Sequence, residues 1–151
     1  MLKRSTVLLS IALIVIALAL AACGGGAAKP AGGEQPAAAA GGNADAGKKL
    51  FNEPVIASAG SPGCVTCHSL EKGKTLVGPS MAGIATVAAA DIKSADYKGT
   101  AKTVEEFLKE SIVNTDVMVT QGFQPGIMPK TYTKLSAQEV SDLVAYLMTL
   151  K

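Results

Sequence analysis

The sequence predicts an all-α domain with about three main helices and long loops, and three observations support this fold class. Two segments, residues 103–114 and 136–150, begin with a capping box and continue with apolar residues on one helical face. No alternation of apolar and polar residues lasts for more than four positions, which argues against a sheet. The segments VGPSMAG (77–83) and QGFQPGIMPK (121–130) are rich in Gly and Pro and therefore predict loops.

Each helix is justified by local signals. Residues 45–52 predict a short helix that ends before Pro54. The two later helices begin with a hydroxyl residue followed by glutamate three positions on: Thr103 with Glu106, and Ser136 with Glu139. Their apolar stripes are Val104, Phe107, Leu108 and Ile112 in the second helix, and Val140, Leu143, Val144 and Leu147 in the third.

The N-terminus has the pattern of a bacterial export signal. A basic start precedes fourteen mostly apolar residues, 7–20, which is shorter than the about 20 residues that a spanning helix needs. The following LAAC, residues 20–23, resembles a lipobox, in which the cysteine is lipidated and becomes the mature N-terminus. We therefore expect a signal peptide over residues 1–22 and a lipid on Cys23. An uncleaved signal anchor or a free Cys23 are the alternatives, and all three export the chain to the extracytoplasmic face of a bacterial membrane.

Composition divides the rest of the chain into a linker and one domain. Residues 23–44 contain almost no large apolar side chain after the cysteine, which predicts a flexible Gly/Ala/Pro linker. Residues 45–151 then form one small domain without visible repeats. Without the two basic residues of the signal, twelve basic residues balance twelve acidic ones. The chain has no basic run and no tryptophan, so composition argues against a nucleic-acid partner.

The expected domain has a thin core for its size. It contains six aromatic residues, three Phe and three Tyr, and its long loops also count against a self-sufficient core. Both features are easier to understand if a large apolar cofactor fills the centre.

One pentapeptide, CVTCH, concentrates most of the soft metal ligands of the chain. It contains Cys64, Cys67 and His68, and His68 is the only histidine. Cys-x-x-Cys-His is the attachment sequence of c-type haem. Two thiols three residues apart in a helical turn can form thioethers with the two vinyl groups of one porphyrin, and the histidine then reaches the iron. A zinc site would need about four ligands, a thioredoxin-like pair would need a βαβ context, and a plain disulfide is the remaining alternative.

Residues 45–151 as a whole resemble the class I cytochrome c family. The resemblance includes CVTCH, VGPSMAGI, SIVN, GIMP and the terminal AYL. The run ESIVNTDVMVTQGFQPGIMP is similar to the cytochrome c domain of bacterial haem–copper oxidase subunit II, and similar domains occur as lipoprotein subunits of respiratory complexes. The resemblance implies a small helical fold around one covalent haem c. It also implies that the first and last helices cross at Gly47, near Phe51 and Tyr146.

The resemblance also implies further residues at the haem. Its axial methionine lies in a Met-Pro pair, which corresponds to Met128 here, and Met118 in the same loop region is the alternative. Met81 and Met148 occupy apolar positions that are more typical of core residues. The family pattern further assigns the Pro79 carbonyl to the imidazole N–H of the histidine ligand, and Tyr132 to a hydrogen bond with a haem propionate. If no methionine binds the iron, the sixth position stays open.

These features predict a membrane-tethered one-electron carrier in a respiratory or photosynthetic chain. Its donor would be a quinol-oxidising complex and its acceptor an oxidase or a reaction centre. Two alternatives remain: a fixed haem c subunit of a larger membrane oxidoreductase, and a haem enzyme or gas sensor with a labile sixth ligand. A His/Met pair that fills both axial positions would argue against the last, because substrate could not easily reach the iron.

Overall fold

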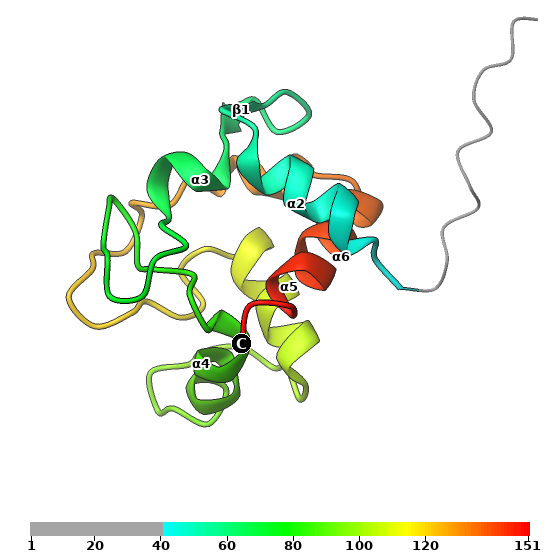
Figure 1. Ribbon diagram of the computed structural model, residues 1–151. Helices are drawn as coiled ribbons and strands as arrows, with labels where there is room; N and C mark the ends of the chain where they lie inside the picture. The colour runs from blue at the N-terminus through cyan, green and yellow to red at the C-terminus, as the bar shows by residue number, and fades with distance from the viewer. Residues whose placement is uncertain (1–40) are drawn as a thin grey trace, which may run out of the picture. The chain divides into compact units, whose positions relative to one another are not determined.

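The computed structural model describes residues 41–151, which fold as a set of helices with one minimal hairpin (Figure 1). The elements are α2 Ala44–Asn52, β1 Val55–Ile56, β2 Ser61–Pro62, α3 Cys64–Cys67, α4 Ile84–Asp91, α5 Val104–Val113, the 3-10 helix η1 Lys130–Lys134, and α6 Ala137–Leu147. The two strands pair antiparallel over two residues each. The all-α class is confirmed, since this hairpin is too short to form a layer of its own.

Helices α2 and α6, from the two ends of the domain, lie against each other (Figure 1). A Cβ at Gly47 would lie 1.9 Å from the carbonyl oxygen of Asp142, so a side chain at this position would force the helices apart. Phe51 and Tyr146 meet edge to face beside this contact, with ring centroids 5.4 Å apart. The close approach expected at Gly47 is therefore present in the structure.

The helix starts follow their capping residues. Thr103 and Ser136 each cap a helix through a complete capping box, as their spacing predicts. Helix α2 begins at Ala44, one residue earlier than expected, because the Asn43 side chain accepts hydrogen bonds from the next turn. Ala44 therefore belongs to the helix and not to the linker.

Two features differ from the sequence-based expectation. Helix α6 ends at Leu147 and not at residue 150, because the last residues form tighter turns and the Leu150 carbonyl accepts from the Ala85 amide at 3.0 Å. Helix α4 was not predicted, because its sequence IATVAAAD has no amphipathic stripe. Its buried residues, Ala85 and Ala88, are small and let the helix pack closely.

The core connects all the longer helices. Its buried members are Phe51, Ile56, Ala59, Ala88, Phe107, Leu108, Ile112, Tyr132, Leu135, Val140, Leu143, Val144, Tyr146 and Leu147. The side chain of Phe107 packs edge to face on Tyr97, which extends this core beyond α5. Within residues 41–151, no helix is long and apolar enough to cross a bilayer.

Candidate functional site

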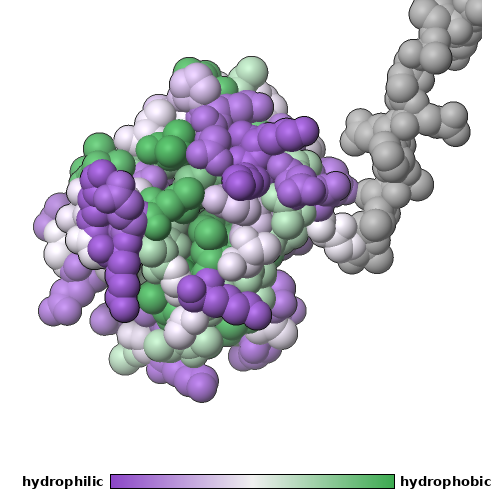
Figure 2. All heavy atoms as spheres, in the orientation of Figure 1, coloured by the Kyte–Doolittle hydropathy of each residue, from purple (hydrophilic) through white to green (hydrophobic). Residues whose placement is uncertain are grey.

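An apolar cavity of about 340 Å³ lies among α3, α4, α5 and the two long loops. Its volume falls in the range of ordinary small-molecule and cofactor sites. Its lining includes Cys64, Cys67, His68, Met128 and Tyr132, which the sequence analysis assigned to one site from three separate segments. Figure 2 shows apolar side chains reaching the surface between hydrophilic groups on the face drawn there.

The two cysteines are positioned by a single helical turn. Helix α3 begins after Gly63, and the His68 amide closes the turn on the Cys64 carbonyl at 2.9 Å. This turn places both thiols on the cavity wall, and they do not form a disulfide with each other. Burial raises the pKa of Cys64 to about 11, so its thiol stays protonated at neutral pH. Within residues 41–151, no group of three or more His, Cys, Asp or Glu side chains is placed to hold a metal ion, which disfavours zinc at this turn.

The imidazole of His68 is fixed from one side. Its Nδ1 lies 2.8 Å from the carbonyl oxygen of Pro79, which can only accept, so Nδ1 carries the proton. Burial lowers the pKa of His68 and this hydrogen bond opposes the shift. The neutral ring then has its lone pair on Nε2, which is the form that binds a metal. The hydrogen bond expected between these two residues is therefore present.

Glycine at position 78 is required by the same imidazole. A Cβ at Gly78 would lie 2.5 Å from Cε1 of His68, which real side-chain contacts do not permit. The Gly78 amide also donates to the Cys67 carbonyl at 2.9 Å. The loop thus returns directly against the cysteine turn, and its backbone forms the wall behind the ring.

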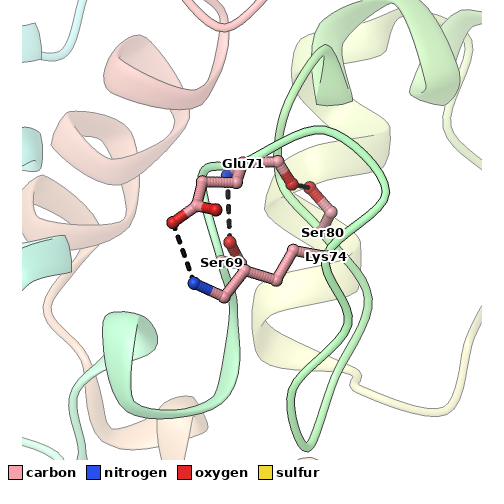
Figure 3. A network of polar contacts seen from close by, with 4 residues as sticks. All are labelled: Ser69, Glu71, Lys74 and Ser80. Atoms are coloured by element: carbon pink, nitrogen blue, oxygen red, sulfur yellow. Dashed lines mark hydrogen bonds and ion pairs between the residues drawn. The ribbon is translucent and has the colours of Figure 1, made fainter.

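A polar network shapes the rest of this loop (Figure 3). The backbone of Glu71 makes two hydrogen bonds in this network. Its amide donates to Ser69 Oγ at 2.9 Å, and its carbonyl accepts a hydrogen bond from Ser80 Oγ at 2.7 Å. Its carboxylate pairs with Lys74 at 2.8 Å. These contacts close the loop between His68 and Pro79, and they explain how a segment without helix or strand holds a fixed shape.

The two methionines considered as the axial ligand, Met118 and Met128, lie between α5 and η1. Met118 and Met128 both line the cavity, together with Met81. The structure therefore brings the preferred ligand and its alternative to the same site, and the choice between them stays a prediction. Pro129 follows Met128 and has an extended backbone, as expected for the loop that precedes η1.

Tyr132 has a contact that the sequence did not suggest. Its side chain is buried, and its hydroxyl donates to the Pro62 carbonyl at 2.7 Å. Burial, followed by the nearby cysteines, raises its pKa to about 12, so the phenol keeps its proton. A bond from this proton to a propionate would have to replace the bond to Pro62, and the propionate role stays a prediction.

One lining residue was missed entirely. Ser111 on α5 has a buried hydroxyl without a hydrogen-bond partner, which none of the other described side chains shows. An unpaired buried hydroxyl is costly, so this atom points to a group that occupies the cavity. The sequence contains a signal for the burial of this hydroxyl, because Ser111 lies three residues after Leu108 and four after Phe107, on the apolar face of the helix.

These observations test whether the residues fit a haem. Two thiols on one turn, an imidazole with a free Nε2, a thioether on another loop, an apolar lining and an unpaired hydroxyl all meet at one cavity. The set fits a covalent haem c in every respect that the residues can show. The remaining predicted site residue, Cys23, lies outside the described residues.

A comparison with models of known protein families gives a match to the domain. The model of the family described as Cytochrome c matches residues 44–151, which include every helix named above. No curated protein sequence matches the chain.

Proposed function

The chain belongs to the cytochrome c family, and from this premise we propose that it is a membrane-tethered electron carrier with His68 and Met128 as axial ligands. Membership already makes it a haem-based electron carrier of a family that is not generally enzymatic. It binds covalent haem c, and Cys64 and Cys67 fit the attachment site. Domains of this family are typically extracytoplasmic.

One observation supports the proposed ligation: His68 and Met128 line the same cavity. When bound, haem c supplies a one-electron iron couple. Pro79 holds the imidazole in the tautomer whose Nε2 would bind the iron, and the thioether of Met128 as a second ligand would favour the ferrous state. The apolar lining excludes water from the bound group, and the two thioether links keep it in place.

The tether and the electron route extend this proposal. Cys23 carries the lipid that anchors the mature chain to a bacterial membrane, and a diacyl modification would satisfy the two-signal requirement for stable anchoring. The carrier accepts electrons from a quinol-oxidising complex and passes them to an oxidase or a reaction centre. The sequence run that resembles oxidase subunit II favours a second candidate, a fixed haem c subunit of such a complex.

The ligation is tested by comparing Met128→Ala with Met118→Ala in the purified haem protein. Met128→Ala should remove the thioether-to-iron absorption band, lower the potential and open the iron to cyanide. Met118→Ala should keep the band, because Met118 is not the proposed ligand. If the band disappears in Met118→Ala and persists in Met128→Ala, the ligand is Met118.

The tether is tested separately with Cys23→Ser. This variant should lose membrane attachment or processing while its haem spectrum stays unchanged. A Cys23→Ser protein that is still cleaved and membrane-bound would point to association with a complex as the anchor. Mild solubilisation of wild-type membranes then separates the two candidates, since a carrier migrates alone and a fixed subunit migrates with its complex.

A further inference from the structure

Two adjacent residues after α5, Thr115 and Asp116, hold the loop that carries Met128. Thr115 Oγ1 donates to the Met128 carbonyl at 3.2 Å. The Asp116 carboxylate accepts from the Gly126 amide at 2.7 Å and pairs with Lys130 Nζ at 3.0 Å. The three contacts therefore fall on Met128 itself and on the residues two positions before and after it.

The loop has few other means of holding its shape. Between residue 124 and the start of η1, the described structure has a turn over Pro125 and Gly126 but no short backbone-to-backbone hydrogen bond. Pro129 has no N–H to contribute. Gly126 adopts the positive φ of +78 that this turn requires. Apart from the packing of Met128 on the core, the segment is thus held by the polar contacts of Thr115 and Asp116.

The three contacts differ in strength. The bond from Gly126 to Asp116 joins a backbone amide to a carboxylate, and such charge-assisted bonds contribute about twice as much as neutral ones. The ion pair contributes less, because the Lys130 side chain is 75% exposed and solvent screens it. The hydrogen bond from Gly126 is also the leading cause that lowers the pKa of Asp116. The amide bond at Gly126 is therefore the main anchor.

We propose that Thr115 and Asp116 form a clamp that positions Met128 and sets how often its thioether leaves the iron. The inference rests on the proposed ligation by Met128. Both clamp residues follow α5, the helix that carries Ser111 and part of the apolar cavity wall, so the loop is attached to that wall. Both also line the cavity, and the role proposed for them is positioning: they act on Met128 through their bonds to its loop.

The test measures cyanide binding to the ferric haem protein, whose rate follows the fraction of time that the sixth position is open. Asp116→Ala should raise this rate the most, by roughly tenfold, because it removes a charge-assisted bond to a backbone amide together with the ion pair. Thr115→Val should raise it by a few fold. Lys130→Met should change it by less than roughly fivefold, because solvent screens an exposed ion pair.

Two controls separate positioning from general weakening. Lys134→Met removes another exposed charge, which forms no ion pair within residues 41–151, and it should leave the rate unchanged. Ser136→Ala destabilises the domain at the cap of α6, beyond η1 and outside the clamp contacts, and it should also leave the rate unchanged.

The outcomes distinguish this inference from the ligation on which it rests. Met128→Ala gives the rate for an open iron; if that variant binds cyanide no faster than the wild type, the ligation itself is wrong. If Met128→Ala is fast while Asp116→Ala and Thr115→Val match the wild type, the ligation stands and the clamp is overturned. A rise in Ser136→Ala equal to that in Asp116→Ala would also overturn it, because the effect would then follow global stability.

Discussion

The two long loops at the cavity are held in different ways. The loop from His68 to Met81 is held mainly by its own atoms: Gly78 bonds to the cysteine turn, Pro79 to the imidazole, and the Met81 amide to the Ser69 carbonyl at 2.8 Å. The loop that carries Met128 is held by side chains of the preceding segment. We call the first the histidine loop (68–81) and the second the methionine loop (121–130).

This difference has a chemical consequence. In the histidine loop the backbone supports the ligand, so no single side-chain truncation releases the imidazole. In the methionine loop a few side chains carry the support, and each can be removed separately. The proposed ligand on the methionine side should therefore be the easier of the two to release by a single substitution.

The largest effect is expected from a side chain at Gly78. Gly78→Val should abolish the native haem spectrum, because even the first added atom would lie 2.5 Å from the His68 ring, and the neighbouring backbone cannot yield easily. Absorption and circular dichroism of the purified haem protein measure this outcome.

Gly126→Ala is the matched change on the methionine loop. A Cβ there meets nothing within 4 Å, and only the positive φ of +78 opposes it, at about 1–2 kcal/mol. This variant should keep its spectrum and lose a little stability in urea. Equal damage from the two substitutions would show that the loops do not differ as described.

The same contrast explains what the sequence could predict. The Cys-x-x-Cys-His motif is contiguous, so Cys64, Cys67 and His68 could be assigned directly, and the capping boxes located α5 and α6. Pro79 and Met128 required the family resemblance, because their places depend on how distant loops return to the motif. Helix α4 could not be predicted, since its alanines carry no periodic signal and its position depends on tertiary contacts such as that between Ala85 and Leu150.

A moderate effect is expected from Ser111→Ala, which tests the cavity wall behind the methionine side. If the buried hydroxyl bonds to the bound cofactor or its axial ligand, its loss removes about 0.5–1.5 kcal/mol of interaction. For a one-electron couple, this would shift the potential by on the order of tens of millivolts. Redox titration measures the shift, and Thr is the conservative replacement that should restore it. An unchanged potential together with raised stability would mean that the hydroxyl has no partner in the haem protein either.

Asp91→Asn on α4, which belongs to neither loop, should shift the reduction potential by a similar or smaller amount than Ser111→Ala. Asp91 and Asp116 are the only carboxylates in the cavity lining, and no Lys or Arg of the described residues joins them there. A carboxylate stabilises the more positive ferric state, so its removal should raise the potential. About 1 kcal/mol for one charge at a partly exposed site corresponds to about 43 mV for one electron.

The pH dependence of the potential gives the sign check for Asp91. Burial raises the pKa of Asp91, so its carboxyl becomes charged only above its ordinary range. The wild-type potential should therefore fall as pH rises through this pKa, and the Asn variant should lack this step. If the reduction potential has the same pH profile in both proteins, the charge of Asp91 does not influence it.

The smallest effect is expected from Glu139→Gln, which lies on α6, outside both loops. Glu139 accepts from the Ser58 hydroxyl at 2.6 Å and from the Ser136 amide at 2.7 Å, and these bonds hold its pKa below the ordinary value of 4.5. Because the folded pKa lies below the unfolded one, the stabilisation is fully present above about pH 5 and is lost as pH falls through the folded pKa. Urea titrations should show Glu139→Gln less stable by under about 1 kcal/mol at pH 7, with the difference vanishing in acid.

The signals of histidine and methionine ligation should both stay unchanged in Glu139→Gln, because the substitution weakens the cap of α6 and none of the loop contacts. Asp116→Ala should affect the methionine signal alone. Loss of the methionine signal in Glu139→Gln would show that ligation on this side follows the stability of the whole domain and not the contacts of the loop.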